Sequence, residues 1–541
     1  MRSGSFAKIV AVGLSVAAAV GASLSRPSPV APRVAVVVQA ASAGDAALAV
    51  RRAGGTVTHD LGLIDGVGAV VTTAQAAELR RAGLRVTEDA PVKLAAESTL
   101  VAASAVPRVT EAARVHAAGV DGYGVTIAFV DSGYGCIDAL NRNDRGQNRI
   151  LAGYDAINNV VNTWAQDDAA GHGTHVMTAA VSSYGTDAAG NQVVAGSWTS
   201  GGVTYHGVAP GADLVSVRAF DANGQATYAS VIRGLAWIVA NAKAYNIRVV
   251  NLSFAAPPRS YYWEDPLNQA VMKAWKAGIV VVASAGNGGP KPMTIGVPGN
   301  VPYVITVGAM TDKYTPLNGG DDVLASFSAA GPTYEGFVKP EMVAPGGHVM
   351  AQMNVNTTIA VAHPEFYNGN YGSYFKMSGT SQAAAVVSGM AALVLSANPA
   401  LTPDQVKYRL MAAARPAVDT SSNLAYSIFQ QGAGVVNAYD AVYDTTTAKA
   451  NQGLDVAADL ANTKHFRGPA NRDSSGRYYV SNVSGAGYAW TGGFLWSNGF
   501  LWSNGFLWSN GFLWSNSWTP GYTFTASKTE AASINAWVSQ E

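Results

Sequence analysis

From residue 109 onward, the chain alternates short apolar runs with stretches of helical periodicity. The runs are rich in β-branched residues and largely apolar at consecutive rather than alternating positions; they are VTIAFV (125–130), LVSVRAF (214–220), IRVVNLSF (247–254), IVVVASAG (279–286) and YVITVGAM (303–310). Strands that are apolar on both faces belong to a parallel sheet covered by helices. The pattern therefore predicts a three-layer α/β domain.

The region before residue 109 has a different order of elements. A strand-like run, VAVVVQA, is followed by an Ala-rich helical stretch, strand-like GTVTHD and GVGAVV, helical TAQAAELRRAG and strand-like LRVTED. This β-α-β-β-α-β order predicts a small α+β domain of ferredoxin-like topology over residues 33–94. The small residues that follow (95–108) predict an exposed, cleavable linker with no strong helix or strand pattern.

The N-terminal end has the features of an export signal. Arg2 and Lys8 precede an apolar run (9–20) and the small residues Gly-Ala-Ser, which predicts a secretory signal over residues 1–22. The run is short for a membrane span, and no later segment has eighteen consecutive apolar residues. We therefore expect a secreted, extracellular protein without a transmembrane span.

The C-terminal extension (446–541) contains four copies of FLWSNG-like units over residues 494–516. Each unit joins four strand-favouring residues to Asn-Gly, a strong hairpin signal. Three interpretations stay open: a meander of short strands, a duplication without a selected role, and docking on the preceding domain or on another surface.

Charge and cysteine content exclude some classes of protein. Lys and Arg number 35, as do Asp and Glu, so nothing in the balance predicts a nucleic-acid partner. The single cysteine, Cys136, excludes an internal disulfide. We expect it to be a small, half-buried hydrophobic residue rather than a reactive thiol.

Polar residues stand where three of the predicted strands end. Asp131 ends the first run, Ser253 lies near the end of the third, and Asn287 follows the fourth. Ligands of parallel sheets bind at the carboxyl ends of the strands. GHGTHV adds His172 and His175, but a zinc clamp of the His-Glu-x-x-His type needs i,i+4 spacing and a glutamate. A catalytic base or a structural histidine is therefore the better interpretation of each.

Three motifs occur in a fixed order: FVDSG with Asp131, GHGTHV with His172, and SGTSQAAAVVSG with Ser381. Serine is a weak nucleophile at neutral pH, so it needs a base, and the base needs a carboxylate that fixes its tautomer. An α/β-hydrolase would require Gly-x-Ser-x-Gly followed by the acid and the histidine, whereas this chain reads GTSQA with both partners ahead of it. The order indicates a nucleophilic hydrolase of another fold.

Together these motifs resemble those of the subtilisin-like serine peptidases. The three boxes above match the family, as do VVVASAGN, HGVAPGADLVSVR, IGVPGNVPYVITVGA and KPEMVAPGG. The resemblance implies a subtilisin-like peptidase domain over residues 109–445 and a serine endopeptidase acting on polypeptides. It implies these roles: Asp131 orients the base, His172 is the base, Ser381 is the nucleophile and Asn287 is an oxyanion donor. His175 is then expected to be structural.

The resemblance implies further features of the site and of maturation. A peptide would pair with the chain at Ser253, Phe254 and Ala255, with its P1 side chain beside Ser284, Ala285, Gly286 and Gly296. Residues 33–94 would be an inhibitor-like propeptide, an intramolecular inhibitor removed by self-cleavage. No cofactor is expected for the chemistry. Structural calcium is common in the family, but the sequence lets us assign no ligand set.

The chain also departs from the family pattern. The family usually has Met after the serine, where this chain has Gln382, and Ser-Pro-His soon after, where it has Ala384-Ala385-Val386. A long stretch before the serine, NVNTTIAVAHPEFYNGNYGSYF, predicts a flap that faces the substrate. The alternative, a silent relative acting as a binding protein, is disfavoured because all four catalytic positions are present.

Overall fold

The computed structural model describes residues 32–88, 102–162, 167–196, 202–368, 373–419, 423–480, 531–534 and 537–541. The chain divides into two compact units, one ending at Ala96 and one beginning at Glu97. The predicted signal (1–22), the first part of the predicted linker (95–101) and the FLWSNG repeats (494–516) lie outside the described residues.

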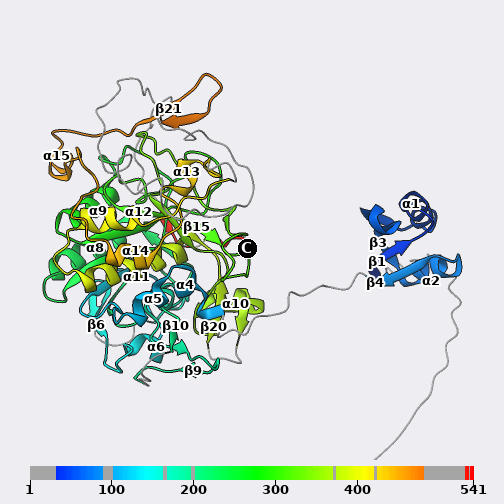
Figure 1. Ribbon diagram of the computed structural model, residues 1–541, viewed down its shortest axis with the longest axis horizontal. Coiled ribbons are helices and arrows are strands. Elements are labelled where there is room, and N and C mark those ends of the chain that lie inside the picture. Colours follow the sequence, from blue (N-terminus) through cyan, green and yellow to red (C-terminus); the bar gives the residue numbers. More distant parts are fainter. Residues whose placement is uncertain are drawn as a thin grey trace, which may run out of the picture. The chain divides into compact units, whose positions relative to one another are not determined.

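The N-terminal unit is a four-stranded antiparallel sheet with two helices, and its elements follow the predicted order (Figure 1). Its strands pair in the order β2-β3-β1-β4. Val38 and Val71 from the sheet and Ala46 and Leu79 from the helices share a core of this unit's own. The bounds are β1 (Arg33–Gln39), α1 (Ala43–Arg52), β2 (Thr56–Leu61), η1 (Gly62–Ile64), β3 (Gly66–Thr72), α2 (Thr73–Arg81) and β4 (Arg85–Glu88).

The C-terminal part of the predicted linker is helical. The expectation of a linker without helix or strand is therefore wrong for this part. Helix α4 (Ala105–Val109) begins inside it, and α5 (Ala112–Ala117) follows. Ala103, Val106 and Pro107 are buried. Burial of these small apolar side chains outweighs the weak helical propensity of the segment, which holds a proline.

The second unit is built on a nine-stranded, mostly parallel sheet, as the apolar runs predict. The strand order is β16-β15-β14-β13-β5-β11-β6-β7, with β17 paired to β15; only β7 and β16 are antiparallel to their neighbours. The bounds are β5 (Thr126–Asp131), β6 (Ile150–Asp155), β7 (Val160–Asn162), β11 (Asp213–Arg218), β13 (Ile247–Leu252), β14 (Val280–Ser284), β15 (Ile305–Thr311), β16 (Val323–Leu324) and β17 (Met342–Pro345).

Helices pack against this sheet as two contacting pairs, α7 with α11 and α8 with α9, which gives the three-layer α/β fold of the prediction. Two helices are deeply enclosed: every residue of α7 is buried, and so is every residue of α11 from Thr380 to Leu395. The helix bounds are α6 (Asp138–Asn141), α7 (His172–Val181), α8 (Tyr228–Asn241), α9 (Pro266–Lys276), α10 (Thr358–Ala362), η2 (Pro364–Phe366), α11 (Thr380–Ala397), α12 (Pro403–Ala412), α13 (Ile428–Gln431), α14 (Ala438–Tyr443) and α15 (Val456–Leu460).

Among the described residues, α11 alone is long and apolar enough to cross a membrane, and 89% of its window is buried inside the unit. Shorter strands form separate, smaller sheets. Their strands are β8 (Gly185–Thr186), β9 (Gln192–Val193), β10 (Thr204–Tyr205), β12 (Gln225–Thr227), β18 (Val349–Gln352), β19 (Tyr367–Asn368), β20 (Tyr374–Met377), β21 (Ala470–Arg472), β22 (Tyr478–Val480) and β23 (Ala531–Ser533).

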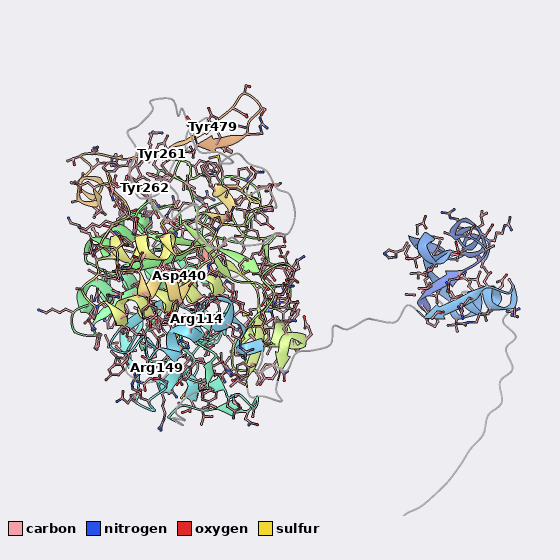
Figure 2. All side chains as sticks on the ribbon, viewed as in Figure 1. Arg114, Arg149, Tyr261, Tyr262, Asp440 and Tyr479 are labelled. Carbon is pink, nitrogen blue, oxygen red and sulfur yellow. The ribbon has the colours of Figure 1, made fainter. Side chains whose placement is uncertain are left out.

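The described part of the C-terminal extension packs on the same unit. Tyr262, labelled in Figure 2, donates a hydrogen bond of 2.8 Å to the buried carboxylate of Asp459 in α15. Tyr303 donates to the same carboxylate oxygen at 2.5 Å. Trp263 stacks on His465 with ring centroids 4.7 Å apart. Residues 446–480 therefore form part of the second unit.

Cys136 differs from its expectation. The side chain is exposed rather than half-buried, and its sulfur accepts a hydrogen bond of 3.2 Å from Asn141 Nδ2. It lies in the loop between Asp131 and α6, where the residues on either side of it are buried. A single small residue in a loop has no periodicity that could have predicted its exposure.

Candidate active site

The predicted site residues converge because parallel strands and two helix N-termini meet at one edge of the sheet. Asp131 is the last residue of β5, and Ser253 follows β13, the strand paired with β5. His172 is the first residue of α7, and Ser381 is the second of α11. Helices α7 and α11 contact each other. Four elements thus bring together residues up to 250 positions apart.

The aspartate and the first histidine form a buried pair. His172 Nδ1 lies 2.8 Å from Asp131 Oδ1, and both side chains are almost completely buried. Because the carboxylate faces Nδ1, that nitrogen carries the proton and Nε2 is left as the basic atom. The pair therefore has the geometry of a general base oriented by an acid.

Asp168, which the sequence analysis missed, fixes the start of the helix that carries His172. Its carboxylate accepts hydrogen bonds from the backbone of Gly171 (2.8 Å) and from both N–H and hydroxyl of Thr174 (2.7 and 2.6 Å). Burial raises its pKa, while those hydrogen bonds oppose the rise. Ser132 Oγ joins it to the site by donating to Asp168 at 2.7 Å. It lies three residues ahead of Gly171, the N-cap of α7, so the usual capping signal does not identify it.

The other end of the same helix is held by a buried arginine. Arg149 (Figure 2) donates 2.5 Å and 2.6 Å hydrogen bonds to the carbonyls of Val181, the last residue of α7, and of Arg142. Burial lowers the pKa of its guanidinium to about 9. A cation at a helix C-terminus satisfies carbonyls that have no partner within the helix. Helix α7 is thus fixed at both ends.

The serine lies where positive potential is highest, in the first turn of α11. Its hydroxyl donates to the carbonyl of Ser253 at 3.0 Å, and Ser253 Oγ donates to the carbonyl of Ser381 at 2.9 Å. Asn287 is oriented by the neighbouring residue, since its Oδ1 accepts from the N–H (3.0 Å) and hydroxyl (2.8 Å) of Thr380. This leaves Nδ2 of Asn287 as the donor on the side of Gly379.

The second histidine has different partners. His175 is fully buried; its Nε2 lies 3.0 Å from the carbonyl of Phe375, and its Nδ1 lies 3.4 Å from the amide nitrogen of Gln382. A carbonyl only accepts, so Nε2 carries the proton and Nδ1 accepts from the amide. Burial lowers the pKa of His175 to about 3. The departure from Met at position 382 therefore supplies a partner for His175.

The residues implied for peptide binding contact one another, and Ser253 among them contacts Ser381. Ser284 Oγ donates to the carbonyl of Phe254 at 3.0 Å, and Gly296 N donates to the carbonyl of Ala285 at 3.0 Å. A Cβ on Gly296 would approach Ala255 Cβ to 2.8 Å, so this close approach requires glycine.

Across the described ranges, no group of three or more His, Cys, Asp or Glu side chains is placed to hold a metal ion. Three converging carbonyls instead accept hydrogen bonds from the ammonium group of a lysine. Lys407 Nζ lies 2.8–3.1 Å from the carbonyls of residues 302–304 and 2.8 Å from Glu341 Oε1. Lys339 Nζ lies 2.6 Å from the same carboxylate oxygen, and burial lowers its pKa to about 7.

Comparison with known proteins adds independent findings. The family described as "Subtilase family" matches residues 122–436, more than half of the chain. The serine protease AprX of Bacillus subtilis is 36% identical over 330 residues, which cover 59% of this chain and 66% of AprX, just under two thirds of that protein. Subtilisin DY of Bacillus licheniformis is 32% identical over 330 residues, which cover 60% of this chain and 94% of subtilisin DY.

Among solved structures, fervidolysin from Fervidobacterium pennivorans, a keratinolytic enzyme related to subtilisin, matches with a TM-score of 0.46 and 22% identity. That match covers 78% of this chain and 62% of fervidolysin.

Proposed function

Because the chain belongs to the subtilase family and residues 122–436 form its serine endopeptidase domain, we propose that Asp131, His172 and Ser381 are its catalytic triad. Asn287 is the oxyanion donor of the same site. The observation that carries the proposal is the buried 2.8 Å pair between His172 Nδ1 and Asp131, which leaves Nε2 as the base.

In the first step the Ser381 hydroxyl proton passes to His172 Nε2 as Oγ attacks the peptide carbonyl carbon. The hydroxyl donates to the carbonyl of Ser253 at 3.0 Å before substrate binds, so this hydrogen bond must break before the proton can pass to His172. The carbonyl oxygen becomes an oxyanion, which accepts hydrogen bonds from Asn287 Nδ2 and the Ser381 N–H. Asp131 stabilises the imidazolium that forms.

The intermediate collapses when the C–N bond breaks and the leaving amine takes the proton from His172. Water then gives a proton to His172 Nε2 and attacks the acyl carbon, and the second collapse returns that proton to Ser381 Oγ. Polypeptide substrates would pair with the backbone of Ser253–Ala255, and the P1 side chain would lie beside Ser284–Gly286 and Gly296. No step needs a cofactor.

The protein is further proposed to be exported and made as a zymogen. The N-terminal signal supports export, and the N-terminal unit with its own core supports a propeptide that folds as a domain. Self-cleavage needs an extended chain, whereas Ala103 and residues 105–109 are buried or helical. The cut is therefore expected between residues 92 and 101, ahead of the helical part of the linker.

A fluorophosphonate probe tests the nucleophile and the zymogen together. Wild-type protein should label and should mature to a form that begins at residues 92–101, while Ser381→Ala should remain a precursor and not label. Gel electrophoresis with N-terminal sequencing reads both results. Labelling of Ser381→Ala would show that another residue is the nucleophile. Processing of purified Ser381→Ala at the same position, with no other protease present, would contradict self-maturation. A wild-type protein that neither labels nor cuts peptides would indicate a silent relative.

A further inference from the structure

The last described segment of the chain forms a strand beside the predicted substrate-binding backbone. Residues 531–533 (β23) pair antiparallel with β12, so that Ser533 faces Gln225 and Ala531 faces Thr227. On its other side the strand meets Ala255, whose N–H donates to the carbonyl of Ser533 at 3.4 Å. Within the described part of the chain, β12 pairs with β23 alone.

The contacts of this strand are mostly to backbone, as expected for an added peptide strand. Ile534 N donates to the carbonyl of Gly224 at 3.1 Å, next to the β12 pairing. One side-chain contact adds to it, a 3.1 Å hydrogen bond from Gln225 Nε2 to Ser533 Oγ. Main-chain pairing of this kind gives affinity without requiring one particular sequence.

Two side chains of the segment enter the apolar core of the peptidase unit. Ala532 is completely buried and Ile534 is 4% exposed, and both belong to the core cluster of that unit. Ser533, which lies between them, is half-buried. Alternate residues of an extended strand therefore fill apolar positions, which is how a groove for an extended peptide selects side chains.

The residues that follow make separate contacts. Trp537 stacks on His363 with ring centroids 3.6 Å apart and an interplanar angle of 5°. His363 lies in the stretch that the sequence analysis predicts to be a substrate-facing flap. Further on, the Glu541 carboxylate accepts a 3.0 Å hydrogen bond from Ser326 N. Residues 531–534 and 537–541, called the tail segment below, are thus anchored at three places.

The residue that pairs with the tail segment lies close in sequence to a residue that contacts the nucleophile. Ala255, which pairs with Ser533, is two residues beyond Ser253. The carbonyl of Ser253 accepts a hydrogen bond from the Ser381 hydroxyl. Ser253–Ala255 is the backbone to which the proposed function assigns the substrate. A strand paired at Ala255 and a substrate strand paired there would need the same N–H group, so they exclude each other.

We propose that the tail segment is an intramolecular ligand of the enzyme's own substrate site and competes there with polypeptide substrates. The proposal rests on the peptidase function proposed above. The segment also indicates what that part of the site accepts: an extended chain with a small side chain at the Ala532 position and an aliphatic one at the Ile534 position. Substrates gain access when the segment leaves.

Competition of this kind changes KM. If the tail segment fills the site nine-tenths of the time, only one molecule in ten is free to bind, and the apparent KM is raised about tenfold. Ala532→Lys puts a long charged side chain at a completely buried position and should release the segment. Ser539→Lys makes the same charge change at an exposed position of the segment and is the matched control.

The experiment compares matured wild-type, Ala532→Lys and Ser539→Lys enzymes on a chromogenic tetrapeptide anilide. The KM of Ala532→Lys should be about tenfold lower than that of wild type, and that of Ser539→Lys should equal wild type. A fluorescein-labelled peptide of residues 529–541, followed by fluorescence anisotropy, should bind Ala532→Lys more tightly than wild type and should compete with the anilide. The same peptide with Lys at position 532 should not bind.

Peptide binding requires neither catalysis nor a retained tail segment. It therefore tests the proposal in any preparation of the folded protein. Absence of peptide binding at millimolar concentration in a folded, active Ala532→Lys enzyme would overturn the proposal. Equal KM values in the three proteins, with intact mass confirming that each retains its tail, would also overturn it. A protein that binds the peptide but hydrolyses nothing would overturn the proposed function and leave the docking of the segment standing.

Discussion

Helix α7 carries two histidines one turn apart, and the surroundings of the two differ in kind. His172 meets the carboxylate of Asp131, whereas His175 meets a carbonyl and an amide, those of Phe375 and Gln382. Both side chains are buried to about the same degree. Burial therefore does not distinguish the histidine proposed to be catalytic from the one expected to be structural, whereas the chemistry of their partner atoms does.

A carboxylate beside a ring nitrogen stabilises the charged imidazolium, so His172 can accept a proton during a reaction. Burial lowers the pKa of His175 by more than the hydrogen bond to the Phe375 carbonyl raises it, so His175 stays uncharged at neutral pH. The two positions should consequently fail in different ways when changed: one in turnover, the other in stability.

The largest difference is expected between a substitution of His172 and a substitution of His175. His172→Ala should slow self-processing by a factor on the order of 10⁶, the loss expected when a triad loses its base. His175→Gln should process within about threefold of wild type but lose about 1–3 kcal/mol of unfolding free energy, because buried polar partners are left imperfectly paired. Processing rates after refolding from denaturant, read on gels, and thermal unfolding midpoints measure the two effects. Equal kinetic losses at both positions would break the comparison.

A smaller effect is expected in the acid stability of the fold. Burial lowers the pKa of His175 and His206 to about 3 and that of His116 to about 4, against about 6.5 in an unfolded chain. Between pH 6.5 and these values the unfolded chain binds protons that the folded chain does not, so stability falls as pH falls and is full above pH 6.5. In the Ser381→Ala background, unfolding midpoints from pH 7 to pH 4 should fall less steeply for His175→Gln than for its parent. Parallel curves would mean that His175 does not titrate as described.

The smallest effect is expected at Gln382. Gln382→Met removes the 3.4 Å contact to His175 Nδ1 and leaves that nitrogen buried without its donor, at a cost of about 1 kcal/mol. Hydrolysis of a peptide anilide should stay within about threefold of wild type. The double variant with His175→Gln should lose less stability than the sum of the single variants, since the two residues share one contact. Full additivity would show that the contact contributes nothing.

The parallel sheet and its helices were predictable because their signal is local. Apolar runs such as 125–130 and 279–286 are buried on both faces, and each became a strand within two residues of its run. The sequence also predicted that Asp131, His172 and Ser381 form one site, although their spacing along the chain does not specify how they are arranged in space. That information lies in the motifs as a set and in the rule that ligands bind at the carboxyl ends of parallel strands.

Other features could not be predicted because they depend on contacts between distant segments. The pairing of residues 531–533 with β12 joins positions about 300 apart, and nothing in the short sequence AAS specifies it. Helix α4 was missed because its residues become helical through packing rather than propensity. Asp168 was not predictable for another reason, since it lies three residues ahead of the N-cap of α7 and makes its hydrogen bonds only once the loop is folded.

The ammonium group of Lys407 among the carbonyls of residues 302–304 has a consequence for how that turn keeps its shape. A cation that belongs to the chain is present at one equivalent in every molecule, whatever the dilution or the composition of the medium. The order of this turn therefore follows no binding isotherm. It is lost only when the fold itself is lost, so depletion of a solute leaves this turn unchanged.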